Sequence, residues 1–92
     1  MFDPKYYEDL RGRTTAFLAE IECALRSDQR AILGELIDHN EPGIALEMLI
    51  AMLAEAGESI TREHASQVEL LARDMGLDAS VSQQARAMVQ RG

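Results

Sequence analysis

The chain has few of the residues that small domains use to reinforce a limited core. Its 92 residues include one cysteine, no tryptophan, two phenylalanines and two tyrosines. A single cysteine cannot form an internal disulfide, which suits a reducing compartment. With 47% hydrophobic residues and so few rings, the core must be aliphatic. A chain of this length can bury one such core and little more, so we predict a single domain over residues 1–92.

Signals for export and for membrane insertion are missing as well. The first residues, Met-Phe-Asp-Pro-Lys-Tyr-Tyr, lack the basic segment followed by an apolar one that a secretion signal needs. No uncharged apolar run approaches the length of a membrane span. We therefore expect a cytoplasmic protein that has no membrane partner.

Basic side chains are missing from the middle of the sequence. Between Arg30 and Arg62 there is no lysine or arginine. Six acidic residues occur there and carry −6 of the formal charge of −7: Glu35, Asp38, Glu41, Glu47, Glu55 and Glu58. A patch of one sign steers a partner of the opposite sign. It disfavours nucleic acid or an anionic membrane as the direct ligand, because both need a basic surface. The alternative is that these charges serve only solubility.

Residues for catalysis or cofactor binding do not form a recognisable motif. The two histidines, His39 and His64, lack the spacing to each other or to the cysteine that zinc sites show. The six glycines are scattered and do not form a phosphate-binding loop. We assign no catalytic residue, no metal site and no cofactor, and we expect that the protein is not an enzyme.

Helical periodicity begins near the start of the chain. We predict a first helix with Asp3 as N-cap and Pro4 as its first residue. Its apolar face consists of Tyr7, Leu10, Thr14, Phe17, Leu18, Ile21 and Leu25. A second helix follows Ser27 as N-cap and ends near His39, with Asn40 in the left-handed conformation.

Small residues line the opposite side of this first helix: Gly12, Ala16, Ala19 and Cys23. Such a surface allows another backbone to come close. We favour a neighbouring helix of the same chain over a second copy in a dimer. Packing then explains Cys23 without any chemical reactivity.

The third predicted helix, residues 42–56, begins at Pro42 and is ended by Gly57. One face carries Leu46, Leu49, Ile50 and Leu53, and the other carries Ile44, Met48, Ala51 and Met52. A helix that is apolar on all sides is usually central and buried. In the alternative, the two methionines face a protein partner, since methionine adapts to irregular surfaces.

Two further helices complete the predicted fold. The fourth follows Thr61 as N-cap and ends at Gly76, and the last follows a capping box of Ser80 and Gln83. No alternating strand pattern appears. We predict an all-α bundle of four main helices and a weaker C-terminal helix, with a tail that frays after Met88.

The middle of the chain resembles a known family. The residues concerned are Glu41-Pro42-Gly43-Ile44-Ala45-Leu46-Glu47-Met48-Leu49, then Leu53, Glu55, Ile60-Thr61 and Leu70-Leu71-Ala72-Arg73-Asp74-Met75-Gly76-Leu77. From Leu33 to Leu77 the pattern resembles the MafI-type family of bacterial immunity proteins. The resemblance implies a small acidic helical antidote, encoded beside a secreted polymorphic toxin, that neutralises this toxin in the cytoplasm. The toxins are often RNases, and similar proteins accompany contact-dependent inhibition systems.

The charge and the resemblance together favour an immunity protein that binds a cognate toxin stoichiometrically. A nuclease toxin has a basic cleft that an acidic face would match. The candidate partner-binding residues are Glu35, Asp38, Glu41 and Glu47, with Glu55 and Glu58 as a rim. The alternative is a small helical adaptor or regulatory domain, which could form a homodimer through the small residues of the first helix.

Overall fold

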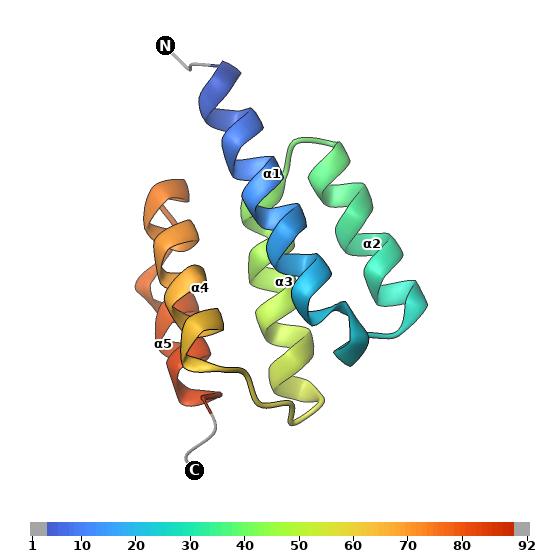
Figure 1. Ribbon diagram of the computed structural model, residues 1–92, viewed down its shortest axis with the longest axis vertical. Coiled ribbons are helices and arrows are strands. Elements are labelled where there is room, and N and C mark those ends of the chain that lie inside the picture. The colour runs from blue at the N-terminus through green and yellow to red at the C-terminus, as the bar shows by residue number, and fades with distance from the viewer. Residues whose placement is uncertain (1–3, 90–92) are drawn as a thin grey trace.

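The computed structural model describes residues 4–89 and shows an all-α protein (Figure 1). Its helices are α1 Pro4–Ile21, the 3-10 turn η1 Glu22–Ala24, α2 Ser27–Asp38, α3 Pro42–Glu55, α4 Arg62–Met75 and α5 Ala79–Ala87. Within this range there is no strand, only an isolated bridge between Ile60 and Val89. The predicted all-α fold, with four main helices and a further C-terminal helix, is confirmed.

The helices form two hairpins with α1 lying across them. α2 and α3 run antiparallel, α4 packs on α5, and α1 crosses in front of α3 (Figure 1). α3 contacts each of the other four α-helices. It is therefore the centre of the bundle, and its direction fixes where the loops at either end lie.

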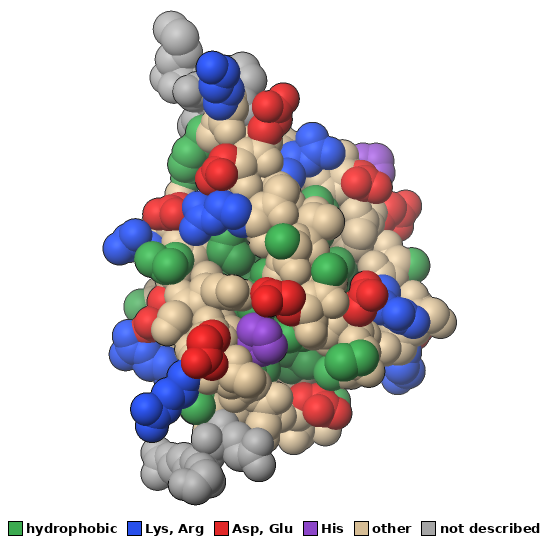
Figure 2. All heavy atoms as spheres, in the orientation of Figure 1, with side chains coloured by type: hydrophobic (Ala, Val, Ile, Leu, Met, Phe, Trp, Pro, Cys, Tyr) green, Lys and Arg blue, Asp and Glu red, His purple; other side chains and the backbone are tan. Residues whose placement is uncertain are grey.

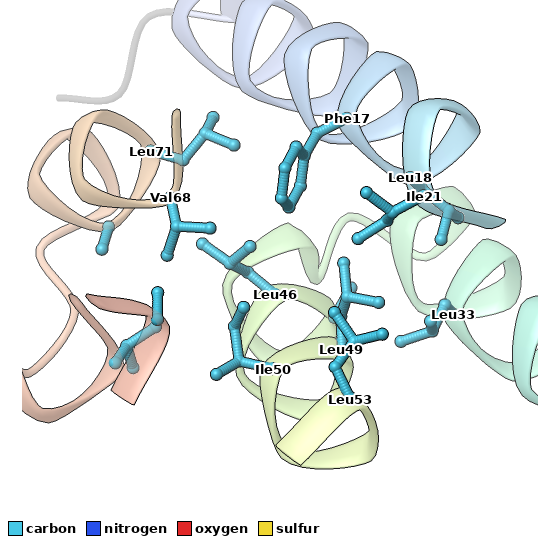
Figure 3. Close-up of a cluster of buried hydrophobic side chains, with 14 of the residues drawn as sticks. Phe17, Leu18, Ile21, Leu33, Leu46, Leu49, Ile50, Leu53, Val68 and Leu71 are labelled. Carbon is cyan, nitrogen blue, oxygen red and sulfur yellow. The ribbon is translucent and has the colours of Figure 1, made fainter. Parts of the chain in front are cut away.

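The core is aliphatic, as predicted, and is built around one face of α3. Leu46, Leu49, Ile50 and Leu53 are each at most 2% exposed and converge with residues of the other helices (Figure 3). Phe17 of α1 inserts its ring into the same cluster. Thr14 is buried beside it, and its hydroxyl donates a 2.7 Å hydrogen bond to the carbonyl oxygen of Leu10. This bond removes the cost of an unpaired buried hydroxyl.

Three helices end in the same way, through one residue in the left-handed conformation. These residues are Asn40, Gly57 and Gly76, with φ of 63°, 70° and 71°. In each case the next N–H bonds the carbonyl five positions earlier: Glu41 to Leu36 at 2.8 Å, Glu58 to Leu53 at 3.0 Å and Leu77 to Ala72 at 2.9 Å. Left-handed backbone is accessible to Gly and Asn at low cost. The predicted stop residues are therefore confirmed, and they set sharp turns after α2, α3 and α4.

The helix starts are confirmed in part. α1 begins at Pro4, while Asp3 lies outside the described residues. Thr61 caps α4, since its hydroxyl accepts a 3.0 Å hydrogen bond from the N–H of His64. The N-cap of α2 is wrong by one residue, because Ser27 is already helical.

The start of α5 and the residues that follow this helix also differ from the prediction. Asp78, not Ser80, caps α5, because the Asp78 carboxylate accepts a 3.3 Å hydrogen bond from the N–H of Ser80. Asp is as good an N-cap as Ser and stands earlier in the chain. Val89, the first residue of the predicted fraying tail, forms the isolated bridge with Ile60, and the carbonyl oxygen of Met88 accepts a 3.0 Å hydrogen bond from the N–H of Ile60. The remaining residues of the predicted fraying tail, 90–92, lie outside the described part.

The small-residue side of α1 is exposed, so the predicted intramolecular neighbour is wrong. Gly12, Ala16 and Ala19 all face solvent, and Cys23, in η1, is exposed as well. α1 lies on the outside of the bundle and turns its other side, with Leu10 and Phe17, toward the core. Packing within this chain therefore does not explain Cys23.

α3 is central, but the prediction that it is buried on all sides is wrong. Ile44 is 46% exposed and Ala51 is exposed, while Met48 and Met52 are half-buried. The other helices cover the face with Leu46 and its neighbours and leave the outer face open. An apolar, partly exposed helix face thus lies beside the acidic residues of the same segment.

Candidate protein-interaction surface

All six carboxylates of the base-free segment are exposed. Within residues 4–89, none of the six takes part in a salt bridge. The salt bridges engage other acids, namely Asp9, Asp28, Glu69 and Asp74. Residues 31–61 therefore present uncompensated negative charge at the surface, as the sequence predicts.

The fold divides the six into a group of four and a group of two. Glu35 and Asp38 are in the last turns of α2, Glu41 precedes α3, and Glu47 follows in its second turn. α3 has 14 residues and is thus about 20 Å long. Glu55 is its last residue and Glu58 follows it, so both lie at the opposite end of the helix from Glu41 and Glu47. The structure therefore places the four residues predicted as the centre at one end of the α2–α3 hairpin and the two predicted as the rim at the other end of α3.

Glu35 and Asp38 share the outer side of α2. The buried residues of that helix are Leu33 and Ile37. At about 100° per residue, Glu35 and Asp38 point away from Leu33 and are three positions apart, so they are neighbours on one surface. Both side chains are exposed, so their charges can change without disturbing the core.

Glu41 and Glu47 line a surface hollow of about 340 Å³. The hollow lies between the start of α1, the turn from α2 to α3, and the end of α4. Its walls also include Tyr6, Tyr7 and Ile44. That Tyr6 and Tyr7 accompany the two acids was not predictable from the sequence, because α1 and α3 are far apart in the chain.

Gly43 makes the close approach at this hollow feasible. A Cβ at Gly43 would lie 3.2 Å from Cδ2 of Leu77, tighter than ordinary van der Waals contact. The start of α3 therefore packs directly on the residues that follow α4. Because Leu77 is itself held by the turn at Gly76, the wall of the hollow is fixed on two sides.

Glu58 has different surroundings. It lines a second hollow, of about 430 Å³, together with Glu20, Arg62, His64 and Cys23. Arg62 supplies there the positive charge that the sequence segment lacks. The electrostatic field around Glu58 is thus mixed, which sets this residue apart from the group at the other end of α3.

The side chains of this second hollow pack on the core and do not form a metal site within the described residues. The His64 ring lies edge-to-face on Phe17, with centroids 5.7 Å apart, so it is half-buried instead of solvated. Within the described residues, no three His, Cys, Asp or Glu side chains come close enough to hold a metal ion. The described helices also include none that is long and apolar enough to cross a membrane.

The charged groups with shifted pKa values belong to ion pairs elsewhere. Arg13 donates a 2.8 Å hydrogen bond to Asp74, which lowers the pKa of Asp74 and raises that of Arg13. The guanidinium of Arg26 lowers the pKa of Asp28 in the same way. These pairs hold helix ends and neighbouring helices, so their shifts do not indicate catalysis.

The candidate surface is therefore an interaction surface with an apolar part and an acidic part. Its apolar part comes from α1 and from the outer face of α3, and its acidic part from the end of α2 and the start of α3. No protein-family model matches the chain, and no curated protein and no solved structure matches it either.

Proposed function

We propose that the protein is an immunity-type inhibitor that binds a basic protein toxin, a nuclease domain such as an RNase, in the cytoplasm and neutralises it stoichiometrically. The observation that carries this proposal is the group of four exposed, unpaired carboxylates at one end of the α2–α3 hairpin: Glu35, Asp38, Glu41 and Glu47. A protein that only needed solubility would not require its acids to be concentrated on one hairpin.

Electrostatics gives such a surface a specific advantage. A nuclease attracts phosphate and therefore has a basic cleft. Opposite fields raise the rate of association by about tenfold to a thousandfold at low salt and suppress partners of the wrong sign. A fast-binding inhibitor needs this property, because it must capture the toxin before the toxin reaches its substrate.

The resemblance to MafI-type immunity proteins supports the same proposal. The residues that carry it lie in α3 and just before it, in the turn before α4, and from the second half of α4 to Leu77. They include Glu41 and Glu47, and also Ile44 on the exposed face of α3. The segment that suggests the family thus contains part of the candidate surface.

Reconstitution with the product of the neighbouring toxin-like gene tests the proposal. We expect a 1:1 complex, loss of the toxin's activity at equimolar inhibitor, and protection of cells that express both proteins. The matched control is an unrelated acidic protein of similar size and charge. Absence of a complex and of protection, with both proteins folded, would contradict the proposal.

A homodimeric adaptor is the second candidate, and the exposure of Gly12, Ala16 and Ala19 favours it. Two α1 helices could approach closely along this side. Sedimentation of the parent chain and of Ala16→Arg distinguishes the cases. A dimer that dissociates on this substitution supports the adaptor, whereas a monomer at every concentration excludes it.

A further inference from the structure

The hollow between α1, the α2–α3 turn and the end of α4 is mainly apolar and partly exposed. Tyr6 is 41% exposed and Ile44 is 46% exposed, and both stand at its surface. Leu10, Met75 and Leu77 line the remaining walls. Exposed apolar side chains grouped around a concave site mark places where a partner docks.

The aromatic part of the wall has a defined arrangement. The rings of Tyr6 and Tyr7 lie edge-to-face, with centroids 5.5 Å apart and planes at 79°. Two rings at right angles offer a face and an edge to the same space. The face of a tyrosine ring attracts a cation, and a guanidinium group also stacks on it.

The charge of the wall selects the kind of group that can enter. Among the described residues that line the hollow, the charged ones are Glu41 and Glu47, both exposed and both outside any salt bridge. Glu41 precedes α3 but makes no capping hydrogen bond with its side chain. Both carboxylates are thus available to an external donor.

We propose that this hollow is the anchor point for an arginine side chain of a basic protein partner. The aliphatic stem of the arginine would lie on Ile44 and Leu77, and its guanidinium would reach the carboxylates of Glu41 and Glu47. Arginine fits better than lysine, because its planar fork bonds carboxylates bidentately and stacks on rings. This inference deepens the proposed function and rests on it, since it names the part of the partner that the acidic surface receives.

The geometry of the hairpin supports an anchor at this place. Glu35 and Asp38 lie at the end of α2 that leads into the same turn, so they extend the negative field beyond the hollow. Central anchors in pockets carry most of the energy of an interface, while surrounding charges steer. We therefore assign affinity to the hollow and the rate of association to the surface of α2.

A peptide titration followed by NMR tests the anchor without the natural partner. The full ¹⁵N-labelled chain is titrated with a tetra-arginine peptide and, in parallel, with a tetra-citrulline peptide, which keeps the shape but has no charge. We expect the arginine peptide to shift the amides of Tyr6, Gly43 and Ile44 most strongly, and the citrulline peptide to leave them unchanged.

Two matched variants locate the effect. Glu41→Gln with Glu47→Gln removes two charges from the hollow, and Glu35→Gln with Asp38→Asn removes two from the outer side of α2. We expect the first pair to weaken the arginine peptide by about tenfold, the order for two lost charge-assisted hydrogen bonds. The second pair should weaken it by about twofold or less, as screened charges do.

Three results would overturn the inference. They are equal weakening by both pairs of substitutions, no binding of the arginine peptide to the parent, and concentration-dependent shifts of the hollow without peptide, which would assign it to a second copy. The outcome is separable from that of the proposed function. A toxin complex that tolerates Glu41→Gln with Glu47→Gln refutes the anchor alone, whereas arginine binding at the hollow without any toxin complex refutes the inhibitor alone.

Discussion

The side of the molecule built from α1, α4 and α5 and the side built from α2 and α3 use charge in opposite ways. On the first side, acids and bases are interspersed over the face that Figure 2 shows, and ion pairs link the helices. Arg13 bridges α1 to Asp74 of α4, and Arg86 of α5 pairs with Glu69 of α4. On the second side, residues 31–61 have no base, and their carboxylates stay unpaired.

The difference shows which charges the fold itself uses. The pairs of the first side join elements that are distant in sequence, so changing them alters how helices dock. The six carboxylates of residues 31–61 form no salt bridge within the described chain and are free to meet an opposite charge from outside. We therefore expect substitutions on the first side to affect stability, and substitutions on the second side to affect binding.

Substitutions in the shared core should have the largest effect on stability. Leu49 and Leu53 are 2% and 1% exposed, and we expect Leu49→Ala or Leu53→Ala to cost about 2–5 kcal/mol of unfolding free energy. Ile44→Ala on the open face of α3 is the control and should cost less than about 1 kcal/mol. Urea denaturation measures all three. A similar loss at Ile44 would show that the two faces of α3 are assigned wrongly.

The ion pair between Arg13 and Asp74 should make stability depend on acid pH. The pKa of Asp74 is lowered in the folded protein by the hydrogen bond from Arg13. A carboxyl with a lowered pKa stabilises the fold above its unfolded pKa and loses this contribution as the pH falls, from about pH 5 downward. We expect Asp74→Asn to flatten this part of the stability curve. Arg13→Gln should do the same, and the double variant should add nothing further.

Thermal melts at a series of pH values measure that dependence. High salt should reduce the difference between parent and variants, because both side chains are about one-third exposed. Parallel stability curves for the parent and Asp74→Asn would mean that the charge of Asp74 does not contribute to stability. The first side would then resemble the second more than we infer.

Replacement of Cys23 should have the smallest effect. The side chain is exposed in η1, so Cys23→Ala should change the unfolding free energy by less than about 0.5 kcal/mol. Toxin neutralisation should be retained. The native parent should react fully with a thiol reagent without denaturant. Loss of protection by a folded Cys23→Ala protein would reveal a function at this site.

The sequence was sufficient for the fold class because local signals agree with the tertiary structure. Asn40, Gly57 and Gly76 end helices because Asn and Gly adopt the left-handed conformation at low cost. The apolar face from Leu10 to Leu25 is buried. Which side of a helix stays open was not predictable. The small residues of α1 allow a neighbour but do not require one. On the outer face of α3, Glu47 and Glu55 share the helical spacing of the exposed Ile44 and Ala51, but the many apolar residues of this helix outweighed that signal in the prediction.

The candidate site was predictable in its charges and not in its shape. The absence of bases from 31–61 can be read directly from the sequence. The hollow requires Tyr6 and Glu47 to meet, and that depends on how α1 crosses α3. For the same reason the sequence could not show that His64 packs on Phe17 of α1.

The most direct test of the proposed division is a charge reversal on each side, measured for both binding and stability. Glu35→Lys with Asp38→Lys changes the second side. The control is Glu20→Lys with Glu22→Lys, which changes two exposed acids, one in the last turn of α1 and one at the start of η1. Glu69 would be a poor control, because it pairs with Arg86.

Association with the toxin is followed at two salt concentrations beside a melting curve. We predict that the α2 variant binds about tenfold or more slowly at low salt, with little change at high salt. Its stability should change by at most about 1 kcal/mol, and the control should bind like the parent. Unchanged association by the folded α2 variant, or equal slowing in both variants, would contradict the assignment of binding to the α2–α3 side.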